Sequence, residues 1–286
     1  MELLSLLMRQ QRGDMVEIPD FRLAGSTGDR LIRILPLTLQ DVSYAVNGMQ
    51  LIKNLSATFS PDTLSVILGP NGAGKSLLLR LCHGLIEPTH GQIQWKERRS
   101  HIVRRFQAMV FQRPIMLRRS VFSNLEHGLR HRGVGKQERL RRIEEILNST
   151  GLARLGRVAA RSLSVGEQQR LAVARAWSLD PEVLFLDEPT AALDPAATHS
   201  LEKIIENIRK SKTKIIMTTH DLGQARRLAD EIFFLYRGRL LEHSNAESFF
   251  EQPKNDLAQS FLRGELLWWN RKELRPPQGS KGTRGL

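Results

Sequence analysis

Eight consecutive residues of this chain have the types and the spacing that bind phosphate. They fit the pattern G-x-x-x-x-G-K-[ST] and are Gly69, Pro70, Asn71, Gly72, Ala73, Gly74, Lys75 and Ser76. Glycines let the backbone curl so that several N–H groups converge on one anionic oxygen. Lys75 would reach the β- and γ-phosphates of a nucleotide, and the Ser76 hydroxyl would bind Mg²⁺. We therefore predict a P-loop that binds ATP, with Leu77 completing the set of nucleotide-binding residues.

The segments on either side of this loop are those that a P-loop requires. The apolar, β-branched run 65–68 predicts a buried strand, and the leucine-rich run 77–81 predicts the start of a helix. A helix N-terminus adds a partial positive charge at the point where the phosphates would lie. The alternative, a glycine-rich turn that binds nothing, does not account for this strand–loop–helix context.

A second apolar run leads directly into two carboxylates. Residues 183–186 are Val-Leu-Phe-Leu, and Asp187 and Glu188 follow. Acids at the end of a buried strand emerge at the edge of a sheet where α/β proteins bind ligands. We predict that Asp187 binds Mg²⁺ and that Glu188 polarises the attacking water. An ordinary acidic turn is the alternative, and the P-loop elsewhere in the chain argues against it.

A third motif opens a helix. Ser164 is followed three residues later by Glu167, which is the pattern of a capping box. Gly166 lies between them, so the helix start would present N–H groups and the positive end of its dipole. The motif has a purely structural interpretation as a cap, and a functional one as a binding site for a γ-phosphate.

Taken together, these motifs resemble those of the nucleotide-binding ATPase subunit of an ABC transporter, over about residues 37–243. Residues 163–167 are similar to the family signature Leu-Ser-Gly-Gly-Gln, with Val165 in place of a glycine and Glu167 in place of the glutamine. The resemblance implies an α/β P-loop NTPase core with a largely parallel sheet, an N-terminal antiparallel β subdomain and an inserted α-helical subdomain.

The same resemblance implies further site residues. Gln112 matches the Q-loop glutamine, which contacts Mg²⁺ or water, and Asp194 matches the D-loop acid, which contacts an opposite subunit. His220 matches the switch histidine, whose imidazole donates to the γ-phosphate and holds Glu188 and the water. Tyr44 matches the aromatic residue that stacks on adenine, although a cross-strand packing role is its alternative.

Along the chain we expect four segments. They are an extension at 1–35 that is poorly ordered, an ABC ATPase domain at 36–243 with its helical subdomain at about 113–165, a helical segment at 244–270, and a disordered tail at 271–286. Strands are predicted at 37–45, 51–59, 64–68, 92–95, 107–111, 183–186, 214–217 and 232–236. Helices are predicted at 75–86, within 121–150, and at 165–179, 196–210, 222–229 and 249–261.

The formal net charge is +13, and most of it falls in one region. Residues 96–142 contain fourteen Lys or Arg against three Asp or Glu. Such a patch could face nucleic acid, anionic lipid or an acidic protein, or it could be a solvated face. The chain has a single cysteine, Cys82, which indicates a reducing compartment, and no apolar run of transmembrane length.

Family membership implies partners. A second copy would complete two ATP sites, permease subunits would receive the motion, and a substrate-binding protein would act indirectly. Phe122, Leu125 and Leu129 form an apolar stripe that we assign to permease contact, at the cytoplasmic face of the inner membrane, where the chain would lie peripherally. Segments 124–129 and 259–268 resemble oxyanion importers, which favours tungstate, with molybdate, phosphate and polar amino acids as alternatives. A non-transport ABC ATPase acting on nucleic acid or the ribosome is the alternative of another class, and a nucleotide-binding module without turnover is a third.

Overall fold

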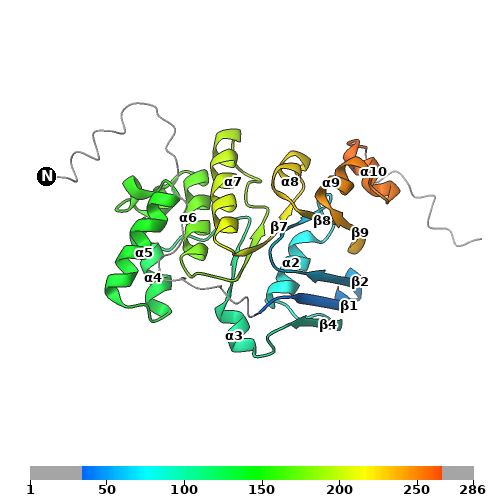
Figure 1. Cartoon of the computed structure of the whole chain (residues 1–286), viewed down its shortest axis with the longest axis horizontal. Coiled ribbons are helices and arrows are strands. Elements are labelled where there is room, and N and C mark those ends of the chain that lie inside the picture. The colour runs from blue at the N-terminus through cyan, green and yellow to red at the C-terminus, as the bar shows by residue number, and fades with distance from the viewer. Residues whose placement is uncertain (1–33, 266–286) are drawn as a thin grey trace, which may run out of the picture. The chain divides into compact units, whose positions relative to one another are not determined.

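A computed structural model describes residues 34–265 of the chain (Figure 1). The predictions for residues 1–33, for 266–270 and for the tail 271–286 lie outside the described residues. Two compact units make up the described part, and β7 (Lys214–Thr219) begins in one and ends in the other. The P-loop unit consists of residues 36–95 and 216–265, and the helical unit consists of residues 34–35 and 96–215.

The P-loop unit contains a three-stranded antiparallel sheet in the order β2-β1-β4. Its strands are β1 (Leu37–Val46), β2 (Met49–Phe59) and β4 (His90–Trp95). Asn47 and Gly48 form the two-residue turn between β1 and β2, with φ of 50° and 79°. Two consecutive positive φ values match the twist of a tight hairpin, so the predicted turn is confirmed.

Parallel pairing also occurs in the P-loop unit. The fully buried β3 (Leu64–Leu68) pairs parallel with β8 (Glu231–Tyr236), in a register that places Leu68 beside Phe234. Because parallel strands end at the same edge, the loops after β3 and β8 emerge together. Strand β9 (Arg239–Asn245), which the sequence did not predict, pairs antiparallel with β8.

Four helices complete the P-loop unit: α2 (Lys75–His83), α8 (Leu222–Leu228), α9 (Ala246–Glu251) and α10 (Asp256–Leu262). Helix α2 ends earlier than predicted because Gly84 adopts the left-handed conformation and its amide caps the carbonyls of the last turn. The single helix predicted at 249–261 is wrong: Pro253 lies between α9 and α10, and it cannot donate a helical hydrogen bond.

The helical unit pairs β5 (Gln107–Val110) in parallel with β6 (Val183–Asp187). Its helices are α3 (Ser100–Arg105), α4 (Val121–His131), α5 (Lys136–Ser149), α6 (Val165–Trp177) and α7 (Pro195–Lys210), with 3₁₀ turns at Ala153–Leu155 and Ala160–Ser162. In Figure 1, α4, α5 and α6 lie side by side in the green part of the chain. The α/β fold class is confirmed.

The core of the helical unit corrects one prediction. Leu125 and Leu129 on α4 are 0% and 1% exposed, and they pack beneath α4 together with Ile143 and Ile146 on α5, which are also fully buried. The stripe that we assigned to permease contact is therefore mainly the internal face of α4. Amphipathic spacing identified an apolar face but did not reveal what covers that face. Of the three stripe residues, Phe122 alone remains partly exposed.

Candidate functional site

The P-loop wraps around its own lysine. Lys75 Nζ donates hydrogen bonds to the carbonyl oxygens of Gly69, at 2.9 Å, and Pro70, at 3.2 Å, and the side chain is 5% exposed. The amide of Ala73 closes the loop on the carbonyl of Pro70 at 3.2 Å. The lysine is thereby held inside the loop by two carbonyl oxygens and is largely shielded from water. This arrangement concentrates positive charge at one point of the loop.

Two glycines of the loop lie close to neighbouring strands. A Cβ on Gly69 would overlap the carbonyl oxygen of Leu235 on β8, and a Cβ on Gly74 would lie 3.0 Å from Cδ1 of Ile52 on β2. Gly74 also has a φ of 103° and is the N-cap of α2, where no side chain caps the first amides. Uncapped amides at a helix start bind anions well.

A pocket of about 630 Å³ brings the P-loop and His220 together. The residues that line it come from the P-loop, the start of α8, the β8–β9 turn and the end of α10: Pro70, Asn71, Gly72, Ala73, His220, Leu222, Tyr236, Arg237, Phe261, Gly264 and Glu265. His220 follows β7 directly and is exposed. His220 therefore shares a pocket with the P-loop, and its role there stays a prediction.

Sequence reasoning missed Tyr236, Arg237 and Phe261 in this pocket. The parallel pairing of β3 with β8 explains the first two, because it brings the end of β8 to the edge of the sheet from which the P-loop emerges. Arg237 also has a φ of 48°, which is uncommon for a non-glycine residue. No local pattern marked Phe261.

Tyr44 lies on the antiparallel sheet of the same unit. It is opposite Ile52 in the β1–β2 pair, and Ile52 is the residue that approaches Gly74 of the P-loop. Directly opposite residues project from the same face of a sheet. Tyr44 is half-buried, and its cross-strand partner Ile52 is the residue that approaches the P-loop. This position is compatible with both of its predicted roles.

The helical unit holds the predicted acids and the Q-loop glutamine. Asp187 ends β6 and is 2% exposed, and Glu188 follows with a φ of 41°. Val110 pairs with Leu186, so Gln112 and Glu188, each two residues further on, leave neighbouring strands at the same level. A left-handed glutamate at such an edge is a strained position of the kind found at functional sites.

The signature segment forms the capping box that its sequence predicts. Ser164 Oγ accepts from the amide of Glu167 at 3.4 Å, and Glu167 Oε2 accepts from the Ser164 amide at 2.8 Å and its hydroxyl at 2.7 Å. These hydrogen bonds, the hydroxyl's first, lower the pKa of Glu167. Glutamate at this position therefore serves the helix start, and Val165 is 59% exposed.

Asp194 caps the helix whose first turn lies against the signature glycine. It caps α7 by accepting from the amide of Ala197 at 2.8 Å, and a Cβ on Gly166 would approach the Cβ of Ala197 to 3.1 Å. The D-loop residue Asp194 and the signature residue Gly166 therefore share one neighbour, Ala197. Within the helical unit, Gln112 and Glu188 follow paired strands, and Gly166 approaches Ala197, the residue whose amide Asp194 caps.

The donor types fit the predicted metal. Ser76, Gln112 and Asp187 all offer oxygen atoms, which Mg²⁺ prefers. Among residues 34–265, no group of three or more His, Cys, Asp or Glu side chains could hold a metal ion by itself. Magnesium is commonly held by one or two protein oxygens together with substrate phosphates.

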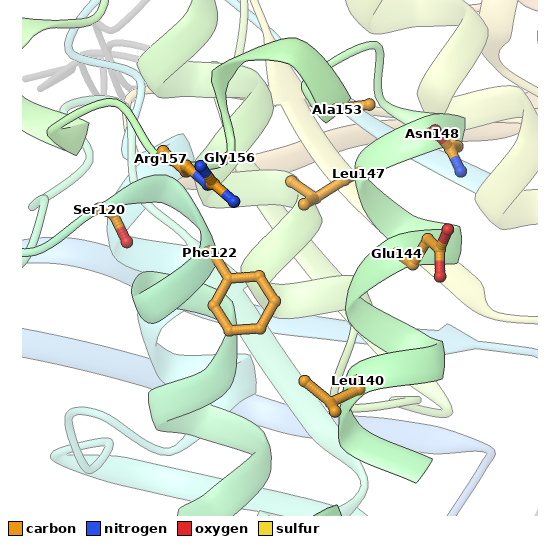
Figure 2. Close-up of a pocket in the computed structure, with 9 residues that line it drawn as sticks. All are labelled: Ser120, Phe122, Leu140, Glu144, Leu147, Asn148, Ala153, Gly156 and Arg157. Atoms are coloured by element: carbon orange, nitrogen blue, oxygen red, sulfur yellow. The ribbon is translucent and has the colours of Figure 1, made fainter. Parts of the chain in front are cut away.

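A second pocket, of about 610 Å³, lies in the helical unit between α4 and α5. Figure 2 shows the Phe122 ring of α4 facing Leu140 and Leu147 of α5, with the charged ends of Glu144 and Arg157 at the sides. Ser120, Asn148, Ala153 and Gly156 also line the pocket. Leu140 is 43% exposed. The pocket is therefore an accessible apolar recess with a polar edge.

Comparisons with a family profile and with individual proteins indicate the same protein family. The sequence profile described as "ABC transporter" matches residues 52–191. The tungstate uptake system ATP-binding protein TupC of Peptoclostridium acidaminophilum is 38% identical over 217 residues, which is 76% of this chain and 100% of that protein. The phosphate import ATP-binding protein PstB of Thermotoga maritima is 37% identical over 233 residues, 75% of this chain and 92% of that protein.

A solved structure is similar as well. The chain is similar to cbiO1 from Clostridium perfringens, described as part of the ABC transporter complex cbiONQ, with a TM-score of 0.69 and 28% identity. The similarity covers 79% of this chain and 94% of cbiO1. In the described part of the chain, no helix is both long enough and apolar enough to cross a membrane.

Proposed function

This chain belongs to the ABC transporter family, and from that premise we propose that it powers import of an oxyanion, tungstate first, through separate permease subunits. Membership makes the chain an ATP-binding subunit and an ATP hydrolase. The substrate rests on two relatives whose names specify tungstate and phosphate. Both are oxyanions with a tetrahedral centre. Molybdate and polar amino acids remain the further alternatives.

The observation that carries the ATPase assignment is the P-loop folded on Lys75, with His220 in the same pocket. Phosphoryl transfer needs positioning and charge neutralisation more than covalent chemistry. Lys75 and the α2 amides would hold the β- and γ-phosphates. Tyr44 would stack on the adenine ring, and His220 would donate a hydrogen bond to the γ-phosphate.

The acids of the helical unit would complete the chemistry. Asp187, Gln112 and Ser76 would hold Mg²⁺, which when bound neutralises the charge that develops on the phosphates. Glu188 would accept a hydrogen bond from the attacking water and orient it toward the γ-phosphorus. The register that pairs Val110 with Leu186, two residues before Gln112 and Glu188, supports this division of roles.

Two copies would share each nucleotide. Ser164, Gly166 and Glu167 of one copy would face the P-loop of the other, and Asp194 would contact the opposite copy. Support comes from the signature helix, whose start is capped by its own side chains and keeps Val165 exposed. A capped helix start presents its dipole to an anion without fraying.

The recess between α4 and α5 would receive an apolar loop of the permease. Its apolar walls, its exposed Leu140 and the cationic segment around it support this assignment. A peripheral position at the cytoplasmic face of the inner membrane follows from such a contact, and a substrate-binding protein would act through the permease.

The experiment that tests this function uses the purified full chain. We expect Mg²⁺-dependent ATP hydrolysis that Lys75→Ala abolishes while the variant remains folded by circular dichroism. Uptake of radiolabelled tungstate, molybdate and phosphate by cells lacking the gene would then separate the substrates. Loss of tungstate uptake, restored by wild type and not by Lys75→Ala, supports the proposal. Loss confined to another substrate would replace tungstate.

The charge of the chain favours one second candidate, an ABC ATPase that acts on nucleic acid. The net charge of +13 would support binding to a polyanion. Cell fractionation distinguishes the two functions: membrane association that survives nuclease treatment supports the transporter, and release by nuclease supports the nucleic-acid function.

A further inference from the structure

The segment between Gln112 and α4 is held by a side-chain clamp. Residues 111–119 form no helix or strand, so their backbone groups lack regular partners. Buried or half-buried backbone groups outside secondary structure require side-chain or water partners. Three side chains supply partners here: Asn124 on α4, Arg175 on α6 and Arg161 in the 3₁₀ turn Ala160–Ser162, whose Nε donates to the carbonyl of Met116 at 3.4 Å. We call residues 113–120 the Q-loop segment.

Asn124 supplies most of these hydrogen bonds. Its Oδ1 accepts from the amide of Leu117 at 3.1 Å, and its Nδ2 lies 3.4 Å from the carbonyl oxygen of Leu117, 3.3 Å from that of Arg119 and 3.0 Å from that of Ser120. The side chain is 0% exposed. A buried amide that meets both polarities of one loop fixes the conformation of that loop.

Arg175 supplies a further hydrogen bond from the helix that begins with the signature. Its Nη2 donates to the carbonyl of Ile115 at 3.0 Å, and its Nη1 donates to Asn124 Oδ1 at 3.4 Å. Both acceptors are neutral. Burial lowers the pKa of Arg175, so the surroundings disfavour the cation. A half-buried cation on neutral acceptors is costly for packing alone.

The position of Arg175 connects the Q-loop segment to the signature helix. Ile115 lies three residues after Gln112, and Arg175 lies eleven residues after Ser164, which is about 16 Å along α6. A helix transmits displacement as a rigid element. A movement of the signature end of α6 would therefore pull on the backbone just behind Gln112.

We propose that Arg175, with Asn124, is a positioning pair that holds Gln112 in its working place and couples it to the signature helix. This inference rests on the proposed function, because it takes Gln112 as the residue that contacts Mg²⁺ or water. Arg175 itself touches no reacting atom. Its effect on hydrolysis passes through the Q-loop segment.

The test is a double-mutant cycle in the full chain, with Arg175→Met and Gln112→Ala. Residues that act through one another give non-additive losses. We expect Arg175→Met to lower kcat by roughly 10- to 100-fold, and to lower it no further when Gln112 is already alanine. Arg175→Lys, which keeps a cation of similar reach, restores part of the loss.

Hydrogen exchange supplies a readout that does not depend on catalysis. We expect the amide of Leu117 and its neighbours to exchange about tenfold faster in Arg175→Met, with the exchange of β6 unchanged. Arg139→Met is the matched control. Arg139 is also a half-buried arginine in this unit, and its Nη1 donates to the carbonyl of Val134 at 2.8 Å, away from the Q-loop segment.

The outcomes are distinct. A wild-type chain that does not hydrolyse MgATP contradicts the proposed function. If the wild-type chain hydrolyses MgATP but Arg175→Met lowers kcat by the same factor in the presence of Gln112 and in Gln112→Ala, the clamp alone is contradicted. Unchanged exchange in residues 113–120 also overturns the clamp. If Arg175→Met does not fold, Arg175→Lys carries the same cycle, and additive losses there overturn the proposal.

Discussion

The α carbon of Gly69 faces the carbonyl oxygen of Leu235 so closely that a Cβ on Gly69 would overlap it. This approach joins the first residue of the P-loop to the end of β8, the parallel neighbour of β3. The P-loop is thus shaped from outside by a strand as well as from within by Lys75. The position has no tolerance for a side chain, because the obstructing atom belongs to backbone.

We expect Gly69→Ala to destabilise the chain by about 3 kcal/mol or more, since a backbone atom cannot move aside cheaply, and to weaken ATP binding. Gly48→Ala is the control: Gly48 also has a positive φ, but nothing lies within 4 Å of its added Cβ. It should cost only about 1 to 2 kcal/mol of left-handed strain. Urea denaturation with and without nucleotide measures both. Equal losses would show that conformation alone, and not the Leu235 contact, sets the cost.

A second prediction concerns Glu188. Glu188→Gln should keep the backbone at its φ of 41°. It should also keep the size of the side chain and its capacity for hydrogen bonds, while it removes the charge that polarises water. We expect ATP binding to persist and hydrolysis to fall by roughly 100-fold or more, trapping an ATP-bound pair of subunits. Single-turnover hydrolysis and light scattering in MgATP measure the two effects. Near-normal turnover would remove Glu188 from this role.

The local motifs were predictable because each carries its own physical signal. The P-loop, β6 with its two acids and the capping box at Ser164 depend on residues within a few positions of one another. Helix α3 was missed because Arg99, its N-cap residue, makes no side-chain cap. The internal role of Leu125 was missed because sequence spacing shows an apolar face but not its neighbour.

Long-range contacts were beyond reach for a different reason. Ile115 and Arg175 are 60 residues apart in the sequence, and neither belongs to a motif that points to the other. Phe261 reaches the P-loop pocket from α10 in the same way. Such contacts follow from how elements pack, and a single sequence records packing only as apolar surface. The structure therefore adds the clamp and the pocket wall, while the predicted site residues keep their proposed roles.

The stability that the signature helix contributes should depend on pH through the ionisation of Glu167. Hydrogen bonds to Ser164 lower its pKa in the folded chain, so its ionised form contributes stability above the usual carboxyl pKa of 4.5. That contribution is lost as pH falls through the lowered folded value. We expect Glu167→Gln, which retains the capping box, to lose about 0.5 to 1 kcal/mol at pH 7, where the charge favours the helix dipole.

The difference between Glu167→Gln and wild type should shrink as pH falls below 4.5. Thermal unfolding of both proteins from pH 7 to pH 3 measures this convergence. A constant difference across that range would mean that the charge of Glu167 contributes nothing to the helix start, and that the hydrogen bonds alone do.

The exposed arginines of the Q-loop segment give a prediction about membrane partners. Arg118 and Arg119 are exposed just before α4. Reversing both to Glu should weaken co-purification with the permease subunits, more at low salt than at high salt because exposed charges are screened. The basal ATPase activity of the chain alone is the internal reference. Unaltered assembly would indicate that Arg118 and Arg119 face solvent and do not contact the permease.

The recess between α4 and α5 gives the last prediction. Leu140 is 43% exposed at its mouth, so Leu140→Glu places a charge in the recess without burying it in the core. Surface substitutions of this kind usually change stability by less than about 0.5 kcal/mol. We expect an unchanged melting temperature and basal ATPase activity, together with loss of the stimulation that the permease produces. Leu85→Glu, also on an exposed leucine at 50%, is the matched control in the P-loop unit. Stimulation that survives in Leu140→Glu, or that is lost equally in Leu85→Glu, would place the permease contact elsewhere on the chain.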